Sequence, residues 1–297
     1  MLDCVLIVVA YRSAARLEGL LATVPGSAGE LSWRVVVVNN DPGEDLTSLA
    51  AVHPDVQLLE AGDNLGYAGG LNLGLAAAPP SRWTVFLNPD VRLGEGALAR
   101  MARAAGEDTS VVPLMVDDLG VLDPSLRREP TVLGSLGDGL LGRRWASRPP
   151  WLGETLLDER SYQAPRTVDW ATGAVLLVPT VVTRAVGPWD SDRFFLYSEE
   201  TDYSRRLREA GCAVRFLPEA QVMHGGGGSG TSDDLHALQE VNRVRYFRKW
   251  HAPPAAAAFW GVAVLTNALR SYRPAGRAAL HALLSRRERA ALPGGSR

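Results

Sequence analysis

The stretch CVLIVVAYRS, residues 4–13, decides the fold. Its first six residues, Cys4 to Val9, are all apolar, and three of them are valine. A continuous run of this kind is typical of a strand that is buried on both faces in a parallel sheet. Polar residues end the run, and leucines then recur at helical spacing from Leu17 onward. The segment therefore predicts the first strand and helix of an α/β layer.

Further buried strands are predicted at residues 34–38, 56–59, 83–87, 111–115 and 174–178, and helical patterns separate the first four. Strands and helices that alternate in this way predict a doubly wound α/β sheet. Polar or glycine-rich loops follow the first four strands, and together they should form one crevice that binds a ligand. The first of these turns, residues 10–15, contains no glycine, which disfavours a dinucleotide-binding oxidoreductase.

Composition limits the function and the location. The 297 residues suffice for one large α/β domain or two small ones. A formal net charge of −2 argues against nucleic acid as the main partner. Cys4 and Cys212 lie in apolar runs, which predicts buried thiols in a reducing compartment. The N-terminus enters a strand without a basic leader, so we expect no signal peptide and a cytoplasmic location.

A second stretch, FFLYSEETDYSRRLREAGCAVRFLPEAQVMH at residues 194–224, concentrates the acidic residues. Glu199, Glu200 and Asp202 fall within four positions, and crowded carboxylates repel unless a cation or hydrogen-bond donors share the site. The alternative is a solvated helix start, where acids suit the helix dipole. Residues 88–90, Asn-Pro-Asp, place another acid at the carboxyl end of a predicted strand, which favours a ligand site.

The C-terminal part has a different character. From about residue 233 we predict a helical appendage, and no run reaches the roughly 18 apolar residues of a membrane span. The apolar residues 253–269 lead into an arginine-rich tail, as in a helix that lies on an anionic membrane surface, here the inner face of the plasma membrane. They fit equally a helix packed on the protein body. Residues 117–166 show no regular hydrophobic periodicity, which predicts a functional loop. Either this stretch or the apolar helix at 253–269 can form a homodimer interface.

Taken together, the motifs resemble the family 2 glycosyltransferases of GT-A fold, and among them the rhamnosyltransferase-like group, over residues 4–250. The resemblance implies a catalytic domain at 1–232, with a nucleotide-sugar-binding half at 1–116 and an acceptor half at 117–232, followed by the appendage at 233–297. The implied nucleotide-sugar contacts are Ala10, Tyr11, Arg12, Asn39, Asn64, Gly66, Asn72, Asn88 and Asp90. The implied acceptor contacts are Trp170, Thr172, Gly173 and Trp189. Asn39 departs from the family, which usually has an acid there.

The resemblance also implies the chemistry. Asp90 stands at the last acid of the metal-binding Asp-x-Asp motif, and His224 stands where related enzymes have a second metal ligand. Mixed oxygen and nitrogen ligation fits Mn²⁺ or Mg²⁺. Glu200 stands in the family's acidic signature, and we expect it to be the catalytic base, because a positioned carboxylate can take the proton of the acceptor hydroxyl. Asp202 would fix the helix start or orient the base, and Glu199 would contact the acceptor or a basic partner.

The predicted enzyme is an inverting transferase that moves L-rhamnose from dTDP-rhamnose to a glycan or a polyprenyl-diphosphate-linked acceptor. The glycines at 225–228 would form a flap over the donor. One alternative is a UDP-sugar-dependent hexosyl or galactofuranosyl transferase of the same fold. The other is a non-catalytic module that binds a sugar nucleotide or a glycan.

Overall fold

The structure is a computed structural model that describes residues 1–142, 145–225 and 232–295. Its strands are β1 (Leu2–Ala10), β2 (Trp33–Asn39), β3 (Val56–Glu60), β4 (Ser81–Leu87), β5 (Val91–Leu93), β6 (Thr109–Val116), β7 (Leu126–Arg127), β8 (Arg166–Val168), β9 (Trp170–Ala171), β10 (Val175–Pro179) and β11 (Ala213–His224). Its helices are α1 (Ala14–Ala28), α2 (Thr47–Val52), α3 (Gly66–Ala77), α4 (Ala97–Ala104), α5 (Val132–Leu141), α6 (Thr180–Val186), α7 (Glu199–Glu209), α8 (Asp233–Trp250), α9 (Pro253–Leu269), α10 (Pro274–Leu284) and α11 (Arg286–Ala291), with short 3₁₀ turns η2 (Pro150–Leu152) and η3 (Glu159–Tyr162).

One mixed sheet organises the molecule. Among the described residues its strand order is β3-β2-β1-β4-β10-β6-β11-β5, with β8 also paired to β11. Strands β1 to β4 are mutually parallel, whereas β10 runs antiparallel to both of its neighbours. The carboxyl ends of β1, β2 and β4 therefore meet at one edge, which is where an open α/β sheet binds ligands.

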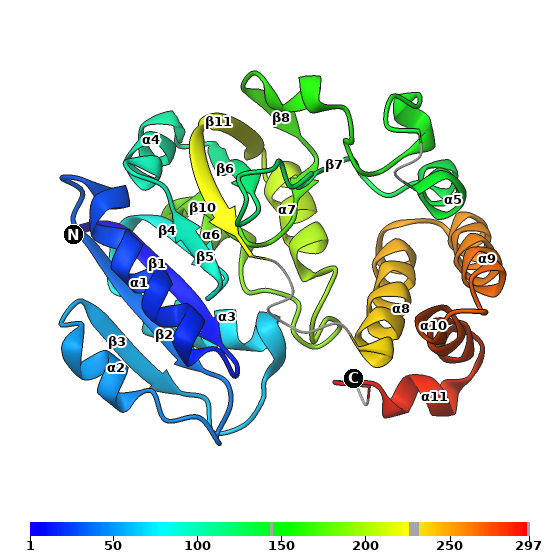
Figure 1. Ribbon diagram of the computed structural model, residues 1–297, viewed down its shortest axis with the longest axis horizontal. Helices are drawn as coiled ribbons and strands as arrows, with labels where there is room; N and C mark the ends of the chain where they lie inside the picture. The colour runs from blue at the N-terminus through cyan, green and yellow to red at the C-terminus, as the bar shows by residue number, and fades with distance from the viewer. Residues whose placement is uncertain (143–144, 226–231, 296–297) are drawn as a thin grey trace.

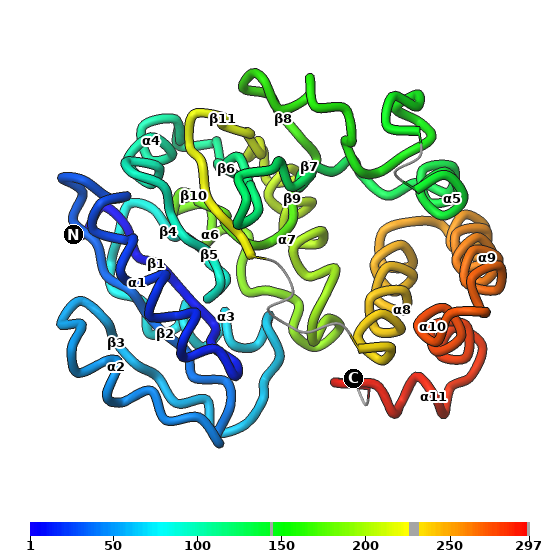
Figure 2. The backbone as a smooth tube through the Cα atoms, in the orientation of Figure 1, coloured from blue at the N-terminus to red at the C-terminus, as the bar shows by residue number. Residues whose placement is uncertain are grey.

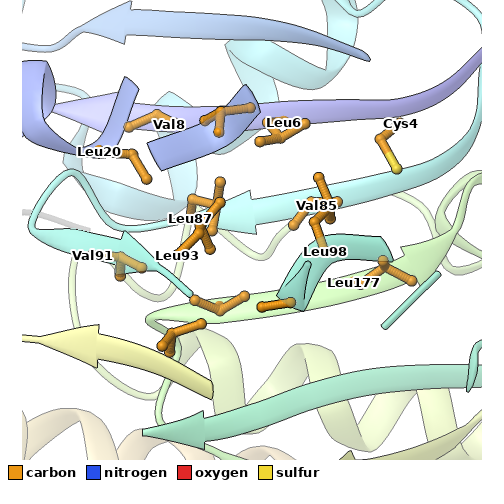
Figure 3. Close-up of a cluster of buried hydrophobic side chains, with 14 of the residues drawn as sticks. Cys4, Leu6, Val8, Leu20, Val85, Leu87, Val91, Leu93, Leu98 and Leu177 are labelled. Atoms are coloured by element: carbon orange, nitrogen blue, oxygen red, sulfur yellow. The ribbon is translucent and has the colours of Figure 1, made fainter. Parts of the chain in front are cut away.

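Each face of the sheet has its own apolar core, because side chains of a strand alternate between the faces. Leu6 and Val8 of β1 pack with Val85 and Leu87 of β4 on the face covered by α1 and α4 (Figure 3). Ile7 of the same strand belongs to the opposite core, beneath α3 and α7. The uninterrupted apolar run at 4–9 is thus explained by burial on both sides, as predicted.

The predicted fold class is confirmed, and the six predicted strands all form, each within two residues of its expected ends. The stretch at 117–166 contains more regular structure than predicted. It holds β7, α5 and two 3₁₀ turns, and β7 lies beside β9 in a separate two-stranded sheet (Figure 2). Of the predicted glycine flap, Gly226 to Gly228 lie outside the described residues.

The C-terminal helices α8–α11 gather on the side of the molecule away from β2 and β3 (Figure 1). They share an apolar cluster in which Phe259 of α9 stacks on Phe247 of α8, with ring centroids 4.1 Å apart. Phe195 and Tyr197, which precede α7, pack against this cluster. None of the described helices is long and apolar enough to cross a bilayer.

Candidate active site

A cavity of about 1070 Å³ opens at the carboxyl edge of the sheet. It brings together most of the side chains that the sequence nominated. The predicted site residues on its wall are Tyr11, Asn64, Gly66, Asn88, Asp90, Trp170, Thr172, Gly173, Glu199, Glu200 and His224. Its far end is lined by α5, α8 and the end of α9, which sequence reasoning did not connect to the site.

The nucleotide side of the cavity is built around Asn40. Its side-chain amide donates to the Asn64 side chain at 3.1 Å and to the Gly66 carbonyl at 3.2 Å, and its oxygen accepts from the Leu65 N–H at 3.0 Å. Gly66 has a φ of +76°, and a Cβ there would lie 2.3 Å from the main-chain oxygen of Phe195, so only glycine fits. Asn40 thus fixes the loop that begins α3.

Four predicted nucleotide contacts lie elsewhere. Ala10 is fully buried in the core, and the exposed Arg12 pairs with Asp41 at 3.1 Å. Asn39 directs its amide to the Glu44 carbonyl and the Glu60 carboxylate, so its neighbour Asn40 is the residue of this turn that reaches the cavity. Asn72 exchanges hydrogen bonds with the main chain of Trp189 and joins α3 to the segment before α7.

Asp90 and His224 lie side by side, with Asp90 Oδ1 3.4 Å from His224 Nε2. Pairing of β11 with β5 places His224 opposite Val91, which explains the proximity of two residues so far apart in sequence. Asp123 Oδ2 lies 3.9 Å from the other ring nitrogen. Burial alone would lower the pKa of His224, but Asp123 and Asp90 raise it to about 9. Burial alone would raise the pKa of Asp90, but His224 holds it below its usual value.

This pair fits a divalent cation. The second oxygen of Asp90 is buried and has no hydrogen-bond partner among the described residues, although Asp90 lines the cavity. A carboxylate oxygen and an imidazole nitrogen are ligands that Mn²⁺ accepts. Among the described residues no group of three or more His, Cys, Asp or Glu side chains is arranged for a metal, so a cation at Asp90 and His224 would need ligand and water oxygens to complete its coordination.

An unusual turn presents the two glutamates. Tyr197 and Ser198 have φ values of +69° and +70°, a left-handed conformation that non-glycine residues rarely adopt. Such residues cost about 1–3 kcal/mol each and gather at functional sites. Helix α7 starts immediately afterwards with Glu199 and Glu200. Gly173 permits the close approach of Glu200, because a Cβ there would lie 3.2 Å from the Glu200 Cβ.

The glutamates carry the clearest electrostatic signature of the cavity. Each has one buried carboxylate oxygen to which no group in the described part of the chain donates a hydrogen bond. Burial, and then the charge of Glu200, raise the pKa of Glu199 well above its usual value, and burial raises the pKa of Glu200. Burial and the charges of Glu199, Glu200 and Asp90 also raise the pKa of Tyr67. Perturbed acids and unpaired polar atoms in a cavity are characteristic of a catalytic site.

Asp202 and Trp189 do not line the cavity. Asp202 is fully buried and accepts from Arg206 at 2.9 Å, Lys249 at 2.6 Å and the Trp250 indole at 2.9 Å. The carboxylate thus forms ion pairs with two cations. Because Lys249 and Trp250 belong to α8, these contacts join α7 to α8. Trp189 stacks on Tyr203, with ring centroids 4.1 Å apart, within the core beneath α7.

Helix α8 supports the turn that carries the glutamates. Asn242, which is fully buried, donates to the Leu196 carbonyl at 2.8 Å, two residues before Ser198. The adjacent Arg243 lines the cavity and pairs with Glu154 at 2.9 Å. Helix α8, which belongs to the predicted appendage, therefore takes part in building the site. Asn40, Tyr67, Asp123 and Arg127 are among the other polar cavity residues that sequence reasoning missed.

Comparisons with known proteins identify the family. A model of the family described as glycosyl transferase family 2 matches residues 5–142. The chain is 33% identical over 233 residues to the N-acetylglucosaminyl-diphospho-decaprenol L-rhamnosyltransferase of Mycobacterium tuberculosis. The aligned region covers 73% of this chain and 74% of that protein. It is 24% identical over 230 residues to the low-salt glycan biosynthesis hexosyltransferase Agl10 of Haloferax volcanii, covering 75% and 67% of the two chains.

Solved structures share the fold. The mannosyltransferase PcManGT from Pyrobaculum calidifontis, in complex with GDP-Man and Mn²⁺, matches with a TM-score of 0.57 over 98% of this chain and 84% of that one, at 16% identity. The TarS 1-349 structure of S. aureus with UDP-GlcNAc gives a TM-score of 0.53 over 98% and 82%, at 13% identity. The fold is that of the GT-A glycosyltransferases. The chain belongs to glycosyl transferase family 2.

Proposed function

We propose that this glycosyltransferase is an inverting, metal-dependent enzyme that transfers L-rhamnose from dTDP-rhamnose to a sugar carried on a polyprenyl diphosphate. The observation that carries the proposal is the convergence of Asp90, His224 and Glu200 on one cavity. The donor sugar and the acceptor class are inferred from the mycobacterial relative, whose name specifies L-rhamnose and a diphospho-decaprenol-linked sugar.

In the proposed reaction Glu200 takes the proton of the acceptor hydroxyl as the acceptor oxygen bonds to the anomeric carbon. The bond between that carbon and the donor's phosphate oxygen breaks, and the nucleoside diphosphate leaves with the bonding electrons. A single displacement of this kind inverts the anomeric configuration. Asp90 and His224 would hold a divalent cation, which stabilises negative charge on the leaving diphosphate. Imidazole ligation favours Mn²⁺ over Mg²⁺.

The donor assignment is tested by thermal shift with dTDP or UDP, each at the same concentration and with Mn²⁺. A ligand that binds only the folded state raises the melting temperature according to its affinity, so dTDP should stabilise the protein more than UDP does. Larger stabilisation by UDP would contradict the rhamnosyl assignment and favour the UDP-sugar-dependent alternative.

We also propose that the protein contacts a membrane surface, where a polyprenyl-linked acceptor would lie. Helix α9 packs one side into the C-terminal cluster through Ala256, Phe259 and Ala263. The large apolar side chains that stay exposed on α9, on the neighbouring α5 and in the segment that follows α5 are Leu133, Leu140, Trp145, Trp151, Leu265 and Leu269. Exposed tryptophans are typical of surfaces that lie at a bilayer interface.

Substitution of Trp151 or Leu269 by glutamate should weaken co-sedimentation with anionic liposomes by about 10-fold, because each apolar side chain of this size contributes about 1.5–3 kcal/mol when it is buried. Val52→Glu is the matched control, since Val52 is 73% exposed and belongs to α2, which lies on the opposite side of the molecule from α5 and α9 (Figure 1). Equal liposome binding by all three variants and the wild type would refute the contact.

A further inference from the structure

The cavity has room for more than the donor. Its volume of about 1070 Å³ exceeds the roughly 300–1,000 Å³ that is typical of a site for one small molecule. It extends from Tyr11 and Asn64 on the nucleotide side to Ser135 of α5 and Gln239 of α8. An acceptor bound beside the donor would therefore fill the part lined by β7, β9 and the helices.

The cationic side chains on this wall differ in what they contact. Within the described residues they are Arg127, Arg148, Arg243 and Arg270. Asp138 pairs with Arg148, and Glu154 pairs with Arg243. Arg270 donates to the carbonyl oxygen of Gly139.

Arg127 keeps most of its guanidinium available. One nitrogen, Nη1, donates to the carbonyl oxygens of Pro124 and Leu126. Among the described residues, neither Nε nor Nη2 of Arg127 donates a hydrogen bond, and no carboxylate lies within 4.0 Å of its guanidinium. A guanidinium has five N–H donors and stays charged at all physiological pH values. Two of its nitrogens can therefore bind an anion in the cavity.

The position of Arg127 associates it with the acceptor. It lies opposite Trp170 in the β7–β9 pair, and its guanidinium carbon is 5.8 Å from the Trp170 ring centroid. The chain continues from Trp170 to Gly173, which packs against Glu200. Arg127 is therefore on the side of the cavity where the proposed base must receive the proton of the acceptor hydroxyl. Its positive charge acts on the Glu200 carboxylate, which agrees with this placement.

We propose that Arg127 binds the diphosphate of a lipid-diphosphate-linked sugar acceptor, and so determines that the acceptor must carry this group. The inference rests on the proposed function for the acceptor class. Arginine suits the role because its planar fork binds phosphate oxygens with two parallel hydrogen bonds. The arrangement holds the acceptor sugar between Arg127 and Glu200.

The test compares two acceptors that share a sugar. One is N-acetylglucosamine on a short-chain prenyl diphosphate, and the other is a neutral alkyl glycoside of N-acetylglucosamine. Arg127→Gln should raise KM for the diphosphate acceptor about 10- to 100-fold, the range expected for a lost charge-assisted hydrogen bond. KM for the neutral glycoside and for the donor should stay within about 2-fold. A KM for the diphosphate acceptor that does not change would overturn the proposal.

Arg128→Gln is the matched control. Arg128 is the next residue, but its side chain donates to the Gly153 carbonyl and does not line the cavity. It should leave KM for both acceptors unchanged. Arg127→Lys keeps the positive charge and should recover part of the lost affinity, which separates a missing cation from a misfolded variant. Equal losses in Arg127→Lys and Arg127→Gln, with lowered melting temperatures, would indicate a structural role and contradict the proposal.

A binding measurement decides the subsite without turnover. Calorimetric titration of a short prenyl diphosphate into the protein saturated with Mn²⁺ and dTDP should show weaker binding by Arg127→Gln than by the wild type, with dTDP affinity unchanged. Weakened dTDP binding instead would assign Arg127 to the donor's diphosphate and overturn the proposal. If the wild type transferred no sugar to either acceptor, the proposed function would fail, while the titration would still test the anion subsite.

Discussion

Replacement of Glu200 by glutamine is expected to lower kcat by about 10²–10⁴-fold, the contribution of a positioned general base. Glutamine keeps the size of the side chain but cannot accept the proton of the acceptor hydroxyl. Donor affinity should stay unchanged, because Glu200 faces the acceptor side near Gly173 and the proposed donor contacts lie at Asn64 and Asp90. Steady-state kinetics together with calorimetric titration of the nucleotide measure both quantities.

Two other acids of α7 provide controls. Glu209→Gln changes an exposed residue at the end of the helix and should leave kcat within about 2-fold. Asp202→Asn should lower the melting temperature, because it weakens the ion pairs with Arg206 and Lys249. Normal turnover in Glu200→Gln would remove the base assignment and favour a site in which another group accepts the proton.

The same assignment predicts the acid side of the pH profile. A general base works only when it is ionised, so kcat/KM falls as the pH drops through its pKa. Burial raises the pKa of Glu200, so the fall should occur at a higher pH than the value of about 4.3 for an unperturbed glutamate. A profile that stays flat down to that value would contradict the assignment.

Asp90→Ala and His224→Ala are each expected to weaken Mn²⁺-dependent nucleotide binding by at least about 10-fold. Loss of an outer-shell partner already costs about 10- to 100-fold in metal affinity, and loss of a direct ligand should cost no less. Titration of dTDP in the presence and absence of Mn²⁺ isolates the part of the affinity that depends on the metal.

The control for this pair is His281→Ala, since His281 is exposed on α10. Asp123→Asn should have a smaller effect than either substitution, because Asp123 lies 3.9 Å from the Nδ1 nitrogen of His224, whereas Asp90 lies nearer, 3.4 Å from Nε2. Metal-dependent binding that is normal in both alanine variants would refute the metal site.

The sheet could be predicted from the sequence because its strands are continuous apolar runs that few other structures explain. The cavity wall was harder to predict. Asn39 and Asn40 are adjacent, and a strand points successive side chains in opposite directions, so the sequence alone does not tell which one reaches the ligand. The structure selects Asn40, whose amide joins Asn64 and Gly66. In the same way, the helical phase of α7 separates Glu200 from Asp202, two acids that look alike in the sequence.

Long-range contacts explain the remaining differences. Arg127 lies in a stretch without hydrophobic periodicity, and that stretch is held by tertiary ion pairs such as Glu129 with Arg205 at 3.0 Å. The left-handed turn at Tyr197 and Ser198 contains no glycine, so the sequence gives no sign of it. Asn242, which supports the turn, belongs to a helix that is distant in the sequence. None of these relations has a local signal, so only the folded chain places Arg127 and α8 at the site.

The most direct test of the account is a crystal structure of the protein with Mn²⁺ and dTDP, with the metal located by its anomalous scattering. The account predicts one Mn²⁺ bound to both Asp90 and His224, with the diphosphate in the same cavity and the Glu200 carboxylate facing the space where a donor sugar would be. A metal peak away from these two residues, or a diphosphate bound outside the cavity, would contradict it.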